Sequence, residues 1–96
     1  MNLKSVFVYS NSIGENTMNM AEATAKRVGE LLVKYDISQY ELRKRTCLSE
    51  KTLIRLLHNR TKDINSSTVF LIANAFGLTM QEFYASPLFN PDNIEV

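Results

Sequence analysis

The segment that decides the fold is residues 38–58, SQYELRKRTCLSEKTLIRLLH. It contains two helix start signals, because Ser38 and Ser49 are of a residue type that caps helix N-termini. Glu41 lies three residues after Ser38 and completes a capping-box pattern at the first of them. The segment therefore predicts two short helices in close succession.

We expect the first helix from Gln39 to about Arg45 and the second from about Glu50 to His58, joined by a turn at residues 46–48. The helical spacing of its leucines predicts that the second helix buries Leu53, Leu56 and Leu57. Two short helices joined by such a turn form the unit that can place one helix in the major groove of DNA.

Three further helices are expected around this pair, at about residues 21–36, 66–76 and 80–84. Their caps are Asn19, Asn65 and Thr79, and Gly77 ends the middle one. Two of these helices have apolar stripes with helical spacing. The stripe of the helix at 21–36 consists of Ala21, Ala25, Val28, Leu31, Leu32 and Tyr35, and that of the helix at 66–76 consists of Val69, Ile72, Ala73 and Phe76. The predicted fold is an all-α, compact five-helix domain.

The length of 96 residues, 45% of them apolar, is that of one small domain. We expect a flexible N-terminal arm at 1–19, the helical domain at 20–85 and an extended C-terminal tail at 86–96. A chain of this size has little room for the deep pocket that most enzymes use, so we expect no enzyme and no catalytic residues.

Charge is distributed unevenly along the chain. Residues 38–62 contain seven bases and two acids, whereas the rest of the chain contains four bases and eight acids. This asymmetry favours a polyanion as the partner of the basic segment, although a solvated basic helix face would have the same composition.

Cysteine and histidine content excludes several classes of protein. One cysteine, Cys47, forms no intrachain disulfide, and one histidine provides no ligand set for a structural zinc, so neither a metal nor a cofactor is expected. The apolar run at residues 6–9 is shorter than the about 7 to 15 residues of a signal peptide's apolar core. We therefore expect a cytoplasmic protein without a membrane partner.

The chain resembles the Cro/repressor-like helix-turn-helix family of the xenobiotic-response-element type over about residues 26–84. The residues that carry the resemblance are Ile37, Ser38, Gln39, Leu42, Leu48, Ser49, Thr52, Leu53 and Leu56, followed by Ile72, Ala73, the run Ala75-Phe76-Gly77-Leu78-Thr79, Glu82 and Phe83. The resemblance implies that Gln39 contacts a phosphate and that Ser49, Glu50, Lys51, Ile54, Arg55 and His58 face DNA.

The chemistry of these side chains agrees with that implication. Lys51, Arg55 and His58 lie on one helix face, where Arg can bind guanine O6 and N7. Ile54 suits a thymine methyl. Glu50 has three open roles: accepting from cytosine N4, disfavouring other sequences as a negative selector, or acting only as a first-turn charge. Arg60 follows the helix and is expected to contact phosphate.

The sequence departs from the family at five positions. Arg43 stands where a small residue lets the two motif helices approach, and Cys47 stands where glycine takes a left-handed turn, so a slightly opened motif is one expectation. We expect Cys47 either to be left-handed or to force a different turn. Leu32 and Leu57 replace an Arg–Glu pair and are expected to pack against each other. Asn59 replaces a further glycine and is expected to terminate the helix.

Other residues have simpler interpretations. The aromatic residues expected in or near the core are Tyr35, Tyr40, Phe70, Phe76, Phe83 and Phe89. A catalytic triad of Ser49, His58 and Asp63 is disfavoured because Ser49 is a good helix cap.

The function predicted from the sequence is a sequence-specific DNA-binding transcriptional regulator, a repressor, which binds double-stranded DNA as a homodimer. Two alternatives are an antitoxin that represses its own operon while binding a toxin, and a protein interaction module with a degenerate motif. Both alternatives add a protein partner.

Overall fold

The computed structural model describes residues 18–58 and 63–95, and this part of the chain contains five α-helices and two 3-10 helices. The α-helices are α1 (Met20–Lys34), α2 (Gln39–Thr46), α3 (Glu50–Leu57), α4 (Ser66–Ala75) and α5 (Met80–Phe83). The 3-10 helices are η2 (Pro87–Phe89) and η3 (Pro91–Asn93). The all-α, five-helix prediction is confirmed.

Polar side chains cap the first turns of the α-helices. The Glu22 backbone N–H donates to the Asn19 side chain over 2.8 Å, and the Asn19 N–H donates to the Glu22 carboxylate over 3.0 Å, which completes a capping box. Thr79 and Glu82 form the same arrangement at α5. Ser38 accepts from the Glu41 N–H, but the Glu41 carboxylate is paired with Arg45, so only half of the predicted capping box forms there.

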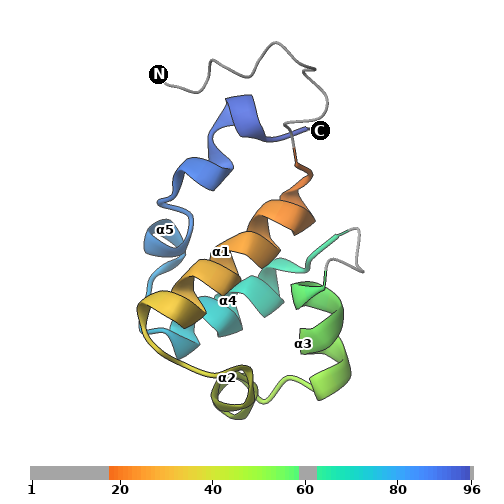
Figure 1. Ribbon diagram of the computed structural model, residues 1–96, viewed down its shortest axis with the longest axis vertical. Coiled ribbons are helices and arrows are strands. Elements are labelled where there is room, and N and C mark those ends of the chain that lie inside the picture. Colours follow the sequence, from red (N-terminus) through yellow and green to blue (C-terminus); the bar gives the residue numbers. More distant parts are fainter. Residues whose placement is uncertain (1–17, 59–62, 96) are drawn as a thin grey trace.

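The core lies between the four longer helices, with α1 packed on α3 and α2 packed on α4. Its buried side chains come from every α-helix and from the C-cap of α4: Val28, Leu31, Leu42, Leu53, Leu56, Val69, Ile72, Ala73, Phe76 and Phe83. Figure 1 shows α2 and α3 together at one end of the molecule and the 3-10 helices at the other. The helix-turn-helix pair is therefore carried on one end of a helical core.

The turn between α2 and α3 is left-handed at Cys47, with φ 61° and ψ 18°, as predicted. Beside it, the buried Thr46 hydroxyl donates to the Leu42 carbonyl over 2.9 Å and accepts from the Leu48 N–H over 3.2 Å. These hydrogen bonds hold the turn closed around a residue other than glycine. A second left-handed residue, Asp36 (φ 54°), joins α1 to α2 and was not predicted.

Cys47→Gly is expected to leave the free energy of unfolding unchanged or to raise it by up to about 1.5 kcal/mol. Glycine removes the penalty of about 1 to 2 kcal/mol for left-handed backbone. It also destabilises the folded state by about 0.5 to 1 kcal/mol, because the unfolded chain gains conformational entropy. Urea denaturation of the two proteins measures the difference. A clear loss of stability in the glycine variant would contradict this account of the turn.

Of the six aromatic residues predicted in or near the core, Tyr40 and Phe70 are exposed instead. Tyr35 is 40% exposed, but its ring lies 6.0 Å from that of the buried Phe76 and is therefore near the core. Phe76 and Phe83 are buried, and Phe89 packs against the core, as predicted. The error at Phe70 follows from its place on α4, where the core side consists of Val69, Ile72 and Ala73. Phe70 follows Val69 in the sequence and therefore lies on a different side of the helix from these core residues.

The residues from 86 onward were expected to form an extended tail, and this is wrong for the described part. Two 3-10 helices form there, and η2 packs on α1. Beyond η3, Met18 and Ile94 form a parallel bridge, in which the Met18 N–H donates to the Asn93 carbonyl over 2.9 Å. The Phe89 ring lies 4.8 Å from that of Tyr84, which explains why this segment is held against the core.

Leu32 and Leu57 are half-buried and pack against the core cluster. They lie on α1 and α3, the two helices that contact each other, so their direct contact stays a prediction. The predicted terminator Asn59 and residues 1–17 of the predicted arm lie outside the described residues.

Candidate nucleic-acid interface

The outward face of α3 is the candidate DNA-contacting surface. Leu53 and Leu56 are buried and fix the opposite face of the helix in the core. The helical period then places the predicted contact residues outward, and all of them are exposed: Glu50, Lys51, Ile54, Arg55 and His58. A shallow hollow on this face is lined by Glu50, Lys51, Ile54 and Arg55.

The cations of this face have no acidic partner among the described residues. Ion pairs in the described part are Arg27 with Glu30 and Arg45 with Glu41, so neither Lys51 nor Arg55 takes part in one. An unpaired, exposed cation is available to a phosphate or a guanine without first breaking an internal contact. The face therefore has the charge expected of a surface that meets a polyanion.

Two predicted contact residues lie at helix starts. Gln39 is exposed at the first position of α2. Ser49 is the N-cap of α3, where its hydroxyl accepts from the Thr52 N–H over 3.1 Å and donates to the Thr52 hydroxyl over 2.9 Å. Ser49 thus orients the first turn of α3. Its hydroxyl is engaged as a helix cap, which gives no support to a catalytic triad of Ser49, His58 and Asp63. Arg60 lies outside the described residues.

The chain matches the profile of the Cro/C1-type helix-turn-helix DNA-binding domain over residues 27–86. It belongs to this family. The matched range runs from within α1 to the residue before η2, so it includes the whole helix-turn-helix pair and the core that carries it. The match is to the Cro/C1-type domain as a whole, and the xenobiotic-response-element subtype stays a prediction. No match was found among curated proteins or among solved structures.

Arg45 is a base of this Cro/C1-type domain whose side chain binds other groups of the protein. Its Nε atom lies 3.1 Å from a Glu41 carboxylate oxygen, and its Nη1 atom donates to the Ala75 carbonyl at the end of α4 over 3.0 Å. The side chain therefore ties α2 to α4. In the sequence Arg45 is only one of the seven bases of residues 38–62, because its acceptor Ala75 lies 30 residues away in the chain.

Arg45→Gln is expected to lower the free energy of unfolding by about 1 kcal/mol, because one charge-assisted hydrogen bond and an exposed ion pair are lost. The slope of log affinity for DNA against log salt concentration should stay unchanged. In the control Lys51→Gln, that slope should fall by about one, as expected for the loss of a DNA-contacting cation. An equal fall in both variants would contradict the structural role of Arg45.

Sequence reasoning missed the part of α2 that faces α3. Tyr40 is 61% exposed, and the Arg43 Cζ and Lys44 Nζ atoms lie 5.3 Å and 5.4 Å from the centroid of its ring. A groove between the two helices is lined by Gln39, Tyr40, Arg43, Glu50, Leu53 and Ile54. The signal that could have revealed Tyr40 is its place next to Gln39, in the first turn of α2.

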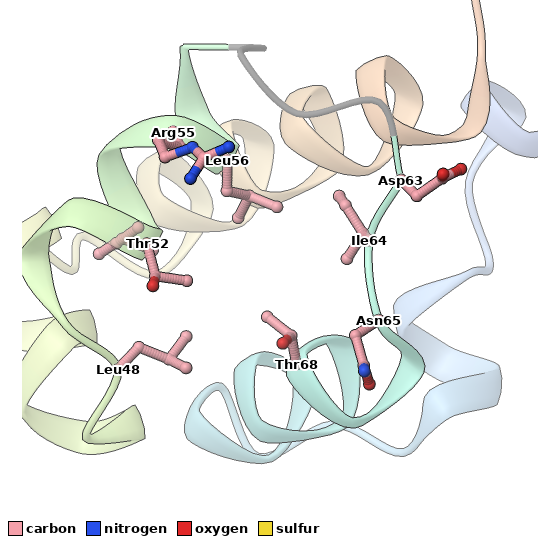
Figure 2. A pocket seen from close by; sticks show the side chains of 9 residues that line it. Leu48, Thr52, Arg55, Leu56, Asp63, Ile64, Asn65 and Thr68 are labelled. Carbon is pink, nitrogen blue, oxygen red and sulfur yellow. The ribbon is translucent and has the colours of Figure 1, made fainter.

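A second hollow, of about 240 Å³, lies between α3 and the start of α4. Figure 2 shows Leu56 and Ile64 pointing toward each other across it, with Thr52 on one side and Thr68 on the other. Its volume is below the about 300 to 1,000 Å³ typical of small-molecule sites. Asn65, on its rim, is occupied in capping α4 through the Ser67 N–H.

No helix in the described ranges 18–58 and 63–95 is long and apolar enough to cross a membrane.

Proposed function

We propose that this Cro/C1-type domain is a sequence-specific transcriptional repressor that inserts α3 into the major groove of its operator. The observation that carries the proposal is the exposed face of α3, where Lys51 and Arg55, neither of them ion-paired within the described residues, flank the apolar Ile54. Repression requires only that the domain occupies its DNA site, whereas activation requires further contacts with the transcription machinery.

Each side chain of the face has a role that its chemistry supports. Arg55 binds guanine O6 and N7 in a bidentate manner, while Lys51 contacts a guanine or a phosphate. Ile54 contacts a pyrimidine methyl, Glu50 accepts from cytosine N4, and His58 contacts the base or phosphate at the end of the helix. Ser49 orients the first turn of α3. Outside α3, Gln39 and Arg60 contact phosphates and thereby fix the position of α3 along the DNA duplex.

We further propose that two copies bind together. The support is α4, in which no residue is charged and two apolar side chains lie on the solvent side, Phe70 at 56% and Leu71 at 39% exposure. A helix that is apolar on its outer side as well suits burial against a protein. Two copies would contact half-sites about 34 Å apart and double the limited DNA surface that one small domain covers.

Phe70→Ser is expected to weaken self-association at least tenfold in dissociation constant, because an exposed aromatic anchor is removed from the proposed interface. Sedimentation equilibrium measures the change, and Val33→Ser on α1 serves as the exposed apolar control. Unchanged association of the Phe70 variant would contradict this interface. A monomeric wild-type chain would contradict the proposal that two copies bind together.

Titration of salt against binding to random duplex DNA tests the proposed function against the rival class, a protein interaction module. A DNA-binding face with several phosphate contacts loses affinity steeply as salt rises. We expect a linear fall of log affinity with log salt concentration, with a slope of several units. Affinity that is weak and independent of salt would contradict DNA binding.

A further inference from the structure

The groove between α2 and α3 opens on the same edge of the molecule as the outward face of α3. Glu50 and Ile54 line both this groove and the hollow on the outer side of α3. Its volume of about 240 Å³ is small for a metabolite and ample for a single substituent of a nucleotide base. A group that projects from DNA lying on α3 would therefore have direct access to the groove.

The walls of the groove combine apolar surface with cations. Leu53 and Ile54 of α3 supply aliphatic side chains, and Tyr40 of α2 supplies an exposed ring. The guanidinium of Arg43 and the ammonium of Lys44 lie over that ring, and neither is ion-paired within the described residues. This charge complements DNA, and the aromatic ring provides an apolar contact surface within reach of it.

Arg43 explains why the groove exists in this chain. Its position is one where a small residue would let α2 and α3 approach closely, and here the half-buried arginine lines the space between them. The side chain is held over Tyr40 and does not fill the floor formed by Leu53 and Ile54. The groove is thus a feature of this chain's own residues.

We propose that this groove binds the C5-methyl group of a pyrimidine in the major groove, with Tyr40 and Ile54 as specificity-determining residues. The C5-methyl is the apolar substituent that base pairs present in the major groove, and it matches aliphatic and aromatic walls. The inference rests on the proposed function, since it requires α3 to lie in the major groove. It adds α2 to the elements that recognise sequence.

The same chemistry has two sources, thymine and 5-methylcytosine, and Glu50 on the rim distinguishes them. A carboxylate accepts a hydrogen bond from the N4 amino group of cytosine, whereas thymine presents the acceptor O4 at the equivalent place. Engagement of Glu50 with the base in the groove therefore favours 5-methylcytosine. If Glu50 points away from that base, thymine is bound.

The test is a binding series on one operator, in which each thymine is replaced in turn by uracil and each cytosine by 5-methylcytosine. Either replacement changes only the C5 substituent. At one position of each half-site we expect about a fourfold change in affinity, the effect of burying one methyl group. A loss with uracil identifies thymine as the source, and a gain with 5-methylcytosine identifies the methylated base.

Variants of the two walls connect the methyl effect to the groove. In Ile54→Ala and Tyr40→Ala the fourfold effect should shrink to less than twofold, while Val33→Ala, an exposed apolar truncation on α1, should retain it. Because each ratio compares two DNAs with one protein, a general weakening of a variant does not imitate the result. Loss of the ratio in the Val33 variant, or its persistence in both wall variants, would overturn the proposal.

A replacement series in which no position changes the affinity distinguishes failure of the methyl site from failure of the proposed function. If no position responds to the C5 substituent while the operator is still preferred over random DNA, neither the groove nor Ile54 contacts a methyl group, and the proposed repressor function stands without that contact. If the chain prefers no operator over random DNA, the proposed function fails and this inference fails with it.

Discussion

Replacing Phe83 by alanine is expected to lower the free energy of unfolding by about 3 to 5 kcal/mol, the range for removing a fully buried aromatic side chain. Phe83 has no exposed surface, and its ring lies 5.2 Å from that of Tyr84 and 6.4 Å from that of Phe89. The substitution therefore leaves a cavity and also loosens the segment that packs back on α1. Because small domains are stable by only about 5 to 15 kcal/mol, the variant should be close to unfolding.

Chemical denaturation at equal protein concentration measures this effect, with Tyr40→Ala as the matched control. Tyr40 is an exposed aromatic residue, and its replacement removes only contacts with two surface cations, worth less than about 1 kcal/mol. Equal destabilisation by the two substitutions would contradict the assignment of Phe83 to the core and of Tyr40 to the surface.

Arg55→Ala is expected to weaken binding to the preferred operator by about 1 to 3 kcal/mol and to relax the preference at one base position. The reason is the loss of a bidentate contact with guanine, which random DNA provides only by chance, so affinity for random DNA should fall less. Arg60→Ala should instead weaken binding to all sequences alike and reduce the salt slope by about one.

Both variants should be measured on operator and random duplex at two salt concentrations. Lys34→Ala serves as the control, because this exposed lysine lies at the end of α1, near Tyr35 and outside the candidate interface. Equal losses on the two DNAs for Arg55→Ala would remove it from the base-contacting set. Lys51, Ile54 and His58 would then remain as the candidates for base recognition.

Much of the fold follows from signals that are local in the sequence. The capping hydrogen bonds of Asn19, Ser49 and Thr79 join residues three positions apart, so residue type and spacing suffice to predict them. The left-handed turn at Cys47 is equally local, although it required comparison with a family whose members have glycine there. Asp36 shows the limit, because aspartate tolerates both helical and left-handed backbone.

The parts that escaped prediction depend on contacts between distant segments. Arg27 donates through Nε to the Phe83 carbonyl over 2.6 Å, and Arg45 donates to that of Ala75, so neither arginine is simply a surface charge. The η2 segment packs on α1 where the rings of Phe83, Tyr84 and Phe89 meet, and the Met18–Ile94 bridge holds the chain beyond it. No local pattern indicates these partners.

The candidate site shows the same division. The outward face of α3 could be predicted, because the buried positions of a helix determine which residues lie opposite them. An opening of the motif at Arg43 could also be predicted, but the side chains that line the groove between α2 and α3 could not, since they depend on how the two helices approach. Tyr40 was placed in the core on its residue type, and its exposure emerges only from that packing.

The central claim is that α3 recognises a DNA sequence, and selection of bound sequences from a random duplex pool by the purified full chain tests it most directly. We predict enrichment of one motif made of two related half-sites, with centres about 10 to 10.5 base pairs apart or at a multiple of this spacing. The same selection with Arg55→Ala should yield a motif that is degenerate at one position of each half-site. A pool that remains random after selection, although the protein is folded, would contradict the claim.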